Sequence, residues 1–250
     1  MNLQSEFAHK NNLLNENALL FILLLVVVYL IYKTHQTPVT GKTFIVNIYL
    51  YVLVALLFIA VIGKYTQNSK ITDANNIWKM SILYFISAFV GIYMMTNDKF
   101  FINHIGFLLL LLALSLIIGS SYKYSTNITQ AATITSIIIA VLTMVVFTQS
   151  EENLEKMKDW LPRLTWILLS VIMVELSYMI FDGNNETIYK IISMSVIILF
   201  SFFILSDTSK LLIESKNLKC KTHDCINYPL KSSSLILDYM NIFVRLLDYK

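Results

Sequence analysis

The chain has few residues that interrupt helices and few that carry charge. Its 250 residues include six glycines and three prolines, and only 14% are charged. So few helix breakers leave the apolar segments uninterrupted, and so little charge excludes an ordinary soluble domain. No segment alternates polar and apolar residues with a period of two, which excludes the strands of a membrane barrel. No polar segment is long enough to bury a core of its own, which excludes an additional globular domain.

The usual signatures of soluble enzymes are also absent. The sequence has no glycine-rich phosphate loop and no nucleophile elbow, and its four histidines are scattered at His9, His35, His104 and His223. We therefore expect no enzyme activity and no cofactor. The net charge of +3 comes without a basic patch interleaved with exposed aromatic residues, so we expect no nucleic-acid partner.

Long apolar runs make up most of the sequence. Hydrophobic residues account for 56% of the chain, and the mean hydropathy is +0.65. Because lipid offers no hydrogen-bond partners to exposed backbone groups, each run is expected to form a helix that satisfies its own. The prediction is an all-α, polytopic membrane helix bundle in a lipid bilayer. We identify seven runs and a weaker eighth: Ala18–Tyr32, Phe44–Ile62, Ile77–Met95, Ile102–Ile118, Ile128–Phe147, Leu161–Phe181, Ile188–Leu205 and Pro229–Leu247.

The first run and the lysine distribution predict a topology. No small-residue cleavage site follows Tyr32, so Ala18–Tyr32 is expected to be a retained anchor rather than a signal peptide. If the seven runs alternate sides, most lysine and arginine residues gather in one set of loops, which should be cytosolic. This places the loop Asp207–Lys231 in the cytosol and the N-terminus outside or in a lumen.

The segment "KCKTHDCINY" has two interpretations. Cys220, His223 and Cys225, with Asp224 beside them, could supply the thiolate, imidazole and carboxylate ligands of a zinc ion. Alternatively, the two cysteines are reduced thiols in a cytosolic loop, where disulfides rarely persist. We favour the reduced thiols, because structural zinc sites usually have a tighter paired-cysteine spacing.

Three carboxylates lie within or at the ends of apolar runs: Glu175, Asp207 and Asp238. A charge at the centre of a spanning helix costs about 2.5 to 3.5 kcal/mol, so each needs a partner, water or a proton. Asp207 also fits a helix-terminal residue at the membrane interface. Glu175 has no matching partner in the sequence, which predicts a neutralised or hydrogen-bonded carboxylate.

The last run carries one polar stripe. Spacings of three and four residues place its polar side chains on one face of a helix, and the other positions are aliphatic or aromatic. Such a helix can turn the stripe toward a bundle interior, or it can lie flat with the stripe in water. The pattern leaves both open. The stripe consists of Lys231, Ser234, Asp238, Asn241, Arg245 and Asp248.

The same segment resembles a known family. "NYPLKSSSLILDYMNIF" is similar to the last-helix signature of the Bax inhibitor family, the transmembrane Bax-inhibitor-motif proteins, which runs roughly D-Y-x-L-x-x-x-x-L-Y-L-D-x-x-N-L-F. "SDTSKLL" is similar to the Y-D-T-Q that closes the family's sixth helix, and "QAATITSIIIAVLTM" to its Q-A-x-x-x-T fourth helix. The matching residues are Tyr228, Leu230, Leu235, Leu237, Asp238, Asn241 and Phe243, then Asp207 and Thr208, then Gln130, Ala131 and Thr135.

The resemblance covers Thr43 to the C-terminus and implies a division into residues 1–42, an extension with one added transmembrane anchor, and residues 43–250. The second part would hold seven family-type helices, the last of them semi-hydrophobic. Asn227 stands where the family has aspartate, and Ser206 where it has tyrosine. The run Ile77–Met95 lacks the arginine that pairs with the sixth-helix aspartate in bacterial members, and Lys99 is the nearest substitute.

What the resemblance implies about function is a calcium-permeable leak pathway, in which Asp207 and Asp238 face each other. Two carboxylates in a low-dielectric site share a proton or a bridging cation, so the pathway should be pH-sensitive. Thr208, Ser234 and Asn241 could add oxygen ligands for calcium, with Glu175 and Arg245 as further polar residues. We expect a role in calcium stores and cell death, in the endoplasmic reticulum, another internal membrane, the plasma membrane or a viral membrane.

An alternative from another class is a non-conducting structural or interaction protein of a viral or organellar membrane, which keeps the fold and binds other membrane proteins. A proton-coupled transporter fits less well, since no pair of broken apolar helices marks a substrate site at the midplane.

Overall fold

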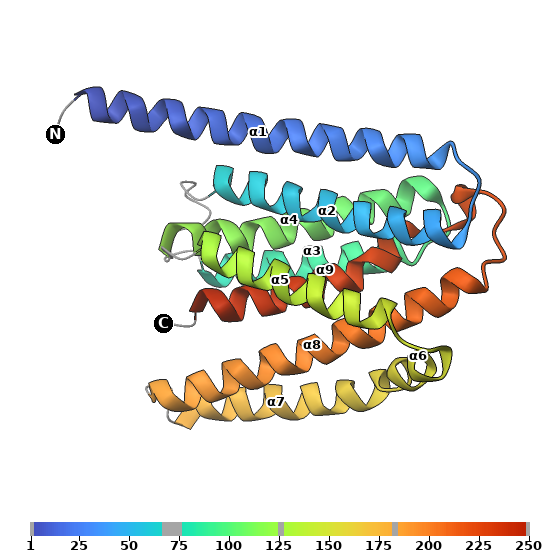
Figure 1. Cartoon of the computed structure of the whole chain (residues 1–250). Coiled ribbons are helices and arrows are strands. Elements are labelled where there is room, and N and C mark those ends of the chain that lie inside the picture. The colour runs from blue at the N-terminus through green and yellow to red at the C-terminus, as the bar shows by residue number, and fades with distance from the viewer. Residues whose placement is uncertain (1–2, 67–76, 125–127, 182–184, 249–250) are drawn as a thin grey trace. The chain divides into compact units, whose positions relative to one another are not determined.

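The computed structural model describes residues 3–66, 77–124, 128–181 and 185–248, and within these ranges it contains helices and no strand (Figure 1). This confirms the all-α prediction. Residue contacts divide the chain into two compact units. Unit 1 comprises Met1–Val39, Val46–Tyr124 and Cys220–Ser232, and unit 2 comprises Thr40–Ile45, Ser125–Lys219 and Ser233–Lys250.

Unit 1 is built mainly from the first four helices and ends in the first turn of the last helix. Its α3 and α4 pack closely, because glycines meet at their contact. A Cβ atom added at Gly91 would lie 2.7 Å from the Gly106 carbonyl oxygen, and one added at Gly106 would lie 2.6 Å from the Gly91 carbonyl oxygen. Any larger residue at either position would push the two helices apart. The elements are α1 (Leu3–His35), α2 (Gly41–Thr66), α3 (Ile77–Met95), α4 (Phe100–Tyr124), the short 3₁₀ helix η3 (His223–Cys225) and the start of α9 (Tyr228–Asp248).

Unit 2 is organised around α8, which packs against α5, α6 and α7. Helices α7 and α8 run side by side in opposite directions (Figure 1). The core that α8 forms includes Phe200, Phe203 and Ile204, and it also takes in Leu164 from α7 and Ile242 from α9. The elements are α5 (Ile128–Phe147), α6 (Glu151–Lys158), α7 (Leu161–Phe181), α8 (Glu186–Lys216) and the greater part of α9.

Six helices are long and apolar enough to cross a membrane, which confirms a multi-pass membrane protein. Of the eight predicted runs, Ile77–Met95 forms α3, whose described apolar part, Ile82–Met95, is shorter than a full span. The weak eighth run lies in α9, which does not meet the criteria for a span. The six are Ala18–His35, Gly41–Thr66, Phe100–Gly119, Ile128–Phe147, Glu151–Tyr178 and Glu186–Lys216.

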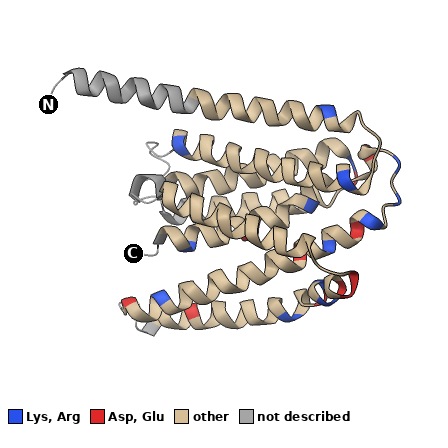
Figure 2. Ribbon diagram, viewed as in Figure 1, with Lys and Arg blue, Asp and Glu red and all other residues tan. Residues whose placement is uncertain are grey.

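Helix α6 was not predicted from the sequence, although its signals are present. Ser150 caps its N-terminus by accepting a hydrogen bond from the Asn153 amide at 3.5 Å. Glu151 and Glu152 occupy the first turn, and Lys156 and Lys158 the last, which is the charge order that the helix dipole favours. In Figure 2 the charged residues of α7 and α8 gather toward the two ends of this helix pair, and the stretch between them is almost uncharged.

Candidate functional site

Asp207 lies in the interior of α8, and the interpretation as a helix-terminal residue is wrong. The helix continues beyond the apolar run to Lys216, two and a half turns further on. The residue is 8% exposed, and its neighbours Ser206, Thr208 and Ser209 are also buried. Hydroxyl side chains and a carboxylate thus form a buried polar segment within an apolar helix.

Asp238 is buried in the middle of α9 and is 6% exposed. A helix that lies flat at the membrane surface keeps one broad face in water and the other in lipid. Helix α9 instead has buried residues on several faces, which include Ser232, Leu235, Ile236, Tyr239, Met240 and Ile242. Within the stripe only Asp238 is buried, whereas Lys231, Ser234 and Arg245 are partly exposed and Asn241 is exposed, so the structure encloses Asp238 without turning the whole stripe toward the protein interior.

Within unit 2 the two aspartates are close enough for the charge of Asp207 to act on the Asp238 carboxyl. Asp207 also accepts a hydrogen bond from the Ser234 hydroxyl, one turn before Asp238 on α9. The cation that acts on Asp207 is Lys210, on the next turn of α8. The structure therefore brings Asp207, Asp238 and Ser234 into one neighbourhood of unit 2.

The pair is incompletely hydrogen-bonded. Among the residues that the structure describes, the buried atoms Asp238 Oδ2 and Thr208 Oγ1 have no hydrogen-bond partner. A buried polar atom without a partner costs roughly 1 to 3 kcal/mol, and more where it is charged. Such atoms are uncommon in native structures, and they indicate a site that a proton, water or ion completes.

Two predicted residues do not join this site. Asn241 is exposed, and its side-chain amide donates to the Leu237 carbonyl of its own helix at 2.8 Å. Lys99 is exposed in the turn between α3 and α4, and no ion pair involves it within the described ranges. The cation whose charge acts on Asp207 is instead Lys210, and its spacing of three residues on the same helix is the sequence signal that could have pointed to it.

Glu175 has a partner that the sequence did not reveal. Arg245 Nη1 and Nη2 donate to Glu175 Oε1 and Oε2, each at 2.6 Å, so the ion pair is bidentate. The side chains of Arg245 and Glu175 are 20% and 18% exposed. Arg245 lies seven residues beyond Asp238, about 10 Å along the helix axis, so this pair forms a second polar site on α9.

Cys220 and Cys225 form a disulfide, so the prediction of reduced thiols is wrong. The 3₁₀ turn between them brings their Cα atoms to 5.9 Å, within the ordinary range for a disulfide. The zinc interpretation of Cys220, His223 and Cys225 also fails. Oxidised cysteines offer no thiolate to a metal, and no group of three or more His, Cys, Asp or Glu side chains in the described part of the chain could hold one.

His223 lies in a hydrogen-bonded cluster of unit 1 and not in a metal site. Its Nε2 lies 3.0 Å from the Thr37 carbonyl oxygen, which can only accept, so Nε2 carries the hydrogen. Its Nδ1 then accepts from the Tyr228 hydroxyl at 2.7 Å and the Asn47 amide at 3.3 Å. Burial lowers the pKa of His223, and the nearby His35 lowers it further. We call these residues, Thr37, Asn47, His223 and Tyr228 with His35, the imidazole cluster.

Helix α5 contributes the remaining matched residues. Ala131 and Thr135 are buried, and the Thr135 hydroxyl donates to the Ala131 carbonyl at 2.7 Å, whereas Gln130 is exposed. Tyr239 of α9 reaches the same helix, with its hydroxyl 3.3 Å from Ser136 Oγ. Ala131 and Thr135 thus face the inside of unit 2, whereas Thr129 and Thr133 of the same helix are exposed.

Comparison with known protein families finds one that covers most of the chain. A family model described as "Inhibitor of apoptosis-promoting Bax1" matches residues 41–249, a range that includes both aspartates and excludes α1. No curated protein matches the chain.

Proposed function

Because the chain belongs to the Bax inhibitor family of membrane proteins, which links it to the inhibition of apoptosis, we propose that it is a pH-sensitive calcium leak channel with Asp207 and Asp238 as its ion site. The family match confirms the resemblance seen in the sequence. One observation carries the proposal: two buried carboxyls interact electrostatically inside a membrane bundle, and one oxygen of Asp238 has no partner in the described part of the chain.

The chemistry of the site suits a calcium ion that passes through rather than stays. Calcium takes six to eight oxygen ligands, and here two carboxylates and the hydroxyls of Ser234 and Thr208 could supply a part of that shell. No third acidic group within the described ranges joins them into a larger cluster. A partial shell completed by water binds weakly, as conduction requires, because an ion that enters must also leave.

Protons compete with calcium for the same oxygens. Two neighbouring carboxyls in a low-dielectric site titrate as a pair, and a proton on either removes charge and a ligand together. Calcium flux is therefore expected to fall as the pH falls.

The proposed setting is an internal membrane that separates a calcium store from the cytosol, with the segment 217–227 between α8 and α9 on the cytosolic side. A leak of this kind would lower the stored calcium, which connects ion flux to cell death. The partners are the lipid bilayer, calcium and other membrane proteins.

Calcium flux into liposomes tests the proposal. Purified protein is reconstituted with a calcium-sensitive dye inside the vesicles, and flux is recorded over a range of pH. We expect flux above that of empty liposomes, a large loss in Asp238→Asn, and no change in Asp98→Asn, which removes an exposed carboxylate outside the site. Flux equal to that of empty liposomes at every pH would reject the channel and favour the non-conducting structural role.

A further inference from the structure

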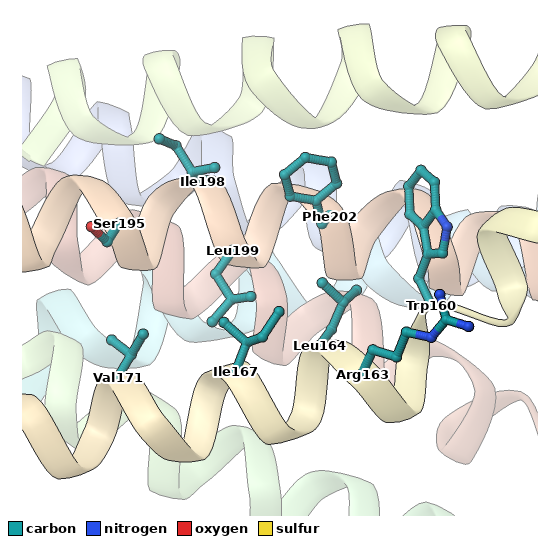
Figure 3. A pocket seen from close by; sticks show the side chains of 9 residues that line it. All are labelled: Trp160, Arg163, Leu164, Ile167, Val171, Ser195, Ile198, Leu199 and Phe202. Carbon is teal, nitrogen blue, oxygen red and sulfur yellow. The ribbon is translucent and has the colours of Figure 1, made fainter.

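A cavity of about 470 Å³ lies between α7 and α8, and neither Asp207 nor Asp238 lines it (Figure 3). Its volume falls in the range typical of small-molecule sites. Leu164 and Ile167 line it from α7, and Leu199 and Phe202 from α8. The hydroxyl in its lining, that of Ser195, already donates to the Ile191 carbonyl at 2.9 Å, so the walls offer a ligand mainly hydrocarbon surface.

One end of this cavity differs in chemistry from the rest. Figure 3 shows Arg163 and Trp160 together at that end, while the aliphatic side chains continue away from them along both helices. Arg163 is exposed and makes no hydrogen bond or ion pair with the described residues. Lys156, Lys158 and Lys216, at the same end of unit 2, all pair with carboxylates of α6. Arg163 therefore carries an available positive charge at the mouth of an apolar cavity.

The chemical type of this cation matters. The sequence contains only two arginines, and the other, Arg245, uses its planar fork to bind a carboxylate in two places. The same fork matches a phosphate group, to which a guanidinium can donate two parallel hydrogen bonds. Trp160 is half-buried, and its ring packs edge-on against Phe202 with the centroids 5.8 Å apart. Indole rings of this kind favour the headgroup level of a membrane.

We propose that the cavity binds one anionic phospholipid, with an acyl chain between α7 and α8 and its phosphate on Arg163. Charge complementarity at one end and hydrocarbon lining along the rest match the two halves of such a molecule. Basic sites between membrane helices bind anionic headgroups by the same physics. The proposal stands independently of calcium conduction, because it uses neither Asp207 nor Asp238.

Quenching of Trp160 fluorescence tests the proposal. Trp78 and Trp166 are replaced by phenylalanine so that Trp160 alone reports, and the full chain is placed in nanodiscs of phosphatidylcholine. Phosphatidylglycerol or phosphatidylcholine with the same brominated acyl chains is then added. We expect the anionic lipid to be preferred roughly fivefold, the size expected for one basic residue at a membrane surface.

Matched variants distinguish the contribution of the headgroup to binding from that of the acyl chain. In Arg163→Gln the preference should fall to about one, whereas Lys156→Gln should leave it unchanged. Ile167→Phe should fill part of the cavity without adding a second tryptophan, and it should weaken quenching of Trp160 by both lipids. Equal quenching by the two lipids in the parent protein, or an unchanged preference in Arg163→Gln, would overturn the proposal. So would full competition by water-soluble glycerol phosphate, which would indicate a site for the free anion.

Discussion

In unit 1 the buried polar side chains of the imidazole cluster are uncharged and hydrogen-bonded to one another, whereas unit 2 buries charged groups. His223 uses both ring nitrogens, and its partners come from the segment after α1, from α2 and from α9. In unit 2 the Glu175–Arg245 pair is also fully matched, but Asp238 keeps an oxygen with no partner in the described residues.

The comparison separates polar groups that hold helices together through hydrogen bonds from a buried carboxyl whose hydrogen bonds are incomplete within the described residues. A satisfied group contributes to stability, and its removal leaves its partner exposed to a low-dielectric interior. An unsatisfied buried carboxyl lowers stability, so its presence needs another reason. We expect substitutions in the two kinds of site to have opposite effects on folding and on function.

The largest loss of stability is expected for Arg245→Met. This change leaves the Glu175 carboxylate half-buried with no cation, which should cost about 2 to 4 kcal/mol, somewhat less than for a fully buried pair. The measurement is chemical unfolding in detergent. The double substitution Glu175→Leu with Arg245→Met should recover most of the loss, because no charge then remains unpaired. Lys190→Met, which breaks the more exposed pair with Glu186, serves as a control and should change stability by less than about 0.5 kcal/mol. A double variant as unstable as Arg245→Met would contradict this account.

The aspartate pair should behave in the opposite way. Asp207→Asn and Asp238→Asn should each weaken calcium binding without lowering the free energy of unfolding, because each removes a charge from a buried site. If the two carboxyls share one ion, the double substitution should do little more than the stronger single one. The measurement is a double-mutant cycle on the free energy of calcium binding. A coupling energy within about 0.3 to 0.5 kcal/mol of zero, typical of distant sites, would show that the two groups act independently.

The imidazole cluster should make the free energy of unfolding depend on pH over a narrow range. Because the pKa of His223 is lowered in the folded protein, the unfolded chain binds a proton more readily below about 6.5, the ordinary value for histidine. Stability should therefore be full above that pH and decline as the pH falls through it, by less than about 1.4 kcal/mol per pH unit. Of the titratable groups near the ring, His35 opposes its protonation and Asp224 favours it.

Unfolding curves recorded from pH 8 to pH 5 measure this effect. His223→Gln cannot take up the proton at this position, so the part of the decline that belongs to His223 should disappear in this variant. An identical pH dependence in the two proteins would mean that other groups cause the decline.

The last prediction concerns the chemical labelling of the two cysteines in the loop before α9, and it involves no change in protein stability. Because Cys220 and Cys225 are bonded to each other, a membrane-impermeant maleimide should label neither in sealed vesicles until a reductant is added. After reduction, labelling should occur from the cytosolic side if the lysine distribution predicts the orientation correctly. Labelling before reduction would contradict the disulfide. Labelling from the opposite side would contradict the predicted orientation. The disulfide itself already argues against that orientation, because disulfides rarely persist in a reducing cytosol.

The sequence by itself determined the class of the protein and the position of most helices. Long apolar runs must form helices in lipid, because the backbone has no other partners there, and this logic holds within each segment. Asp207 and Asp238 could be selected for a similar reason, since a carboxylate in an apolar run is costly and needs an explanation. The added first helix and the family resemblance were also readable from local patterns.

Only the tertiary structure decided which polar groups meet. Arg245 pairs with Glu175 across 70 residues, and His223 bonds Asn47 across 176 residues. Helical spacing relates a residue to others three or four positions away, but it does not say which face of a distant helix packs against it. The cavity behind Arg163 is likewise lined by side chains of both α7 and α8, so it is a property of two packed surfaces and not of either helix sequence alone.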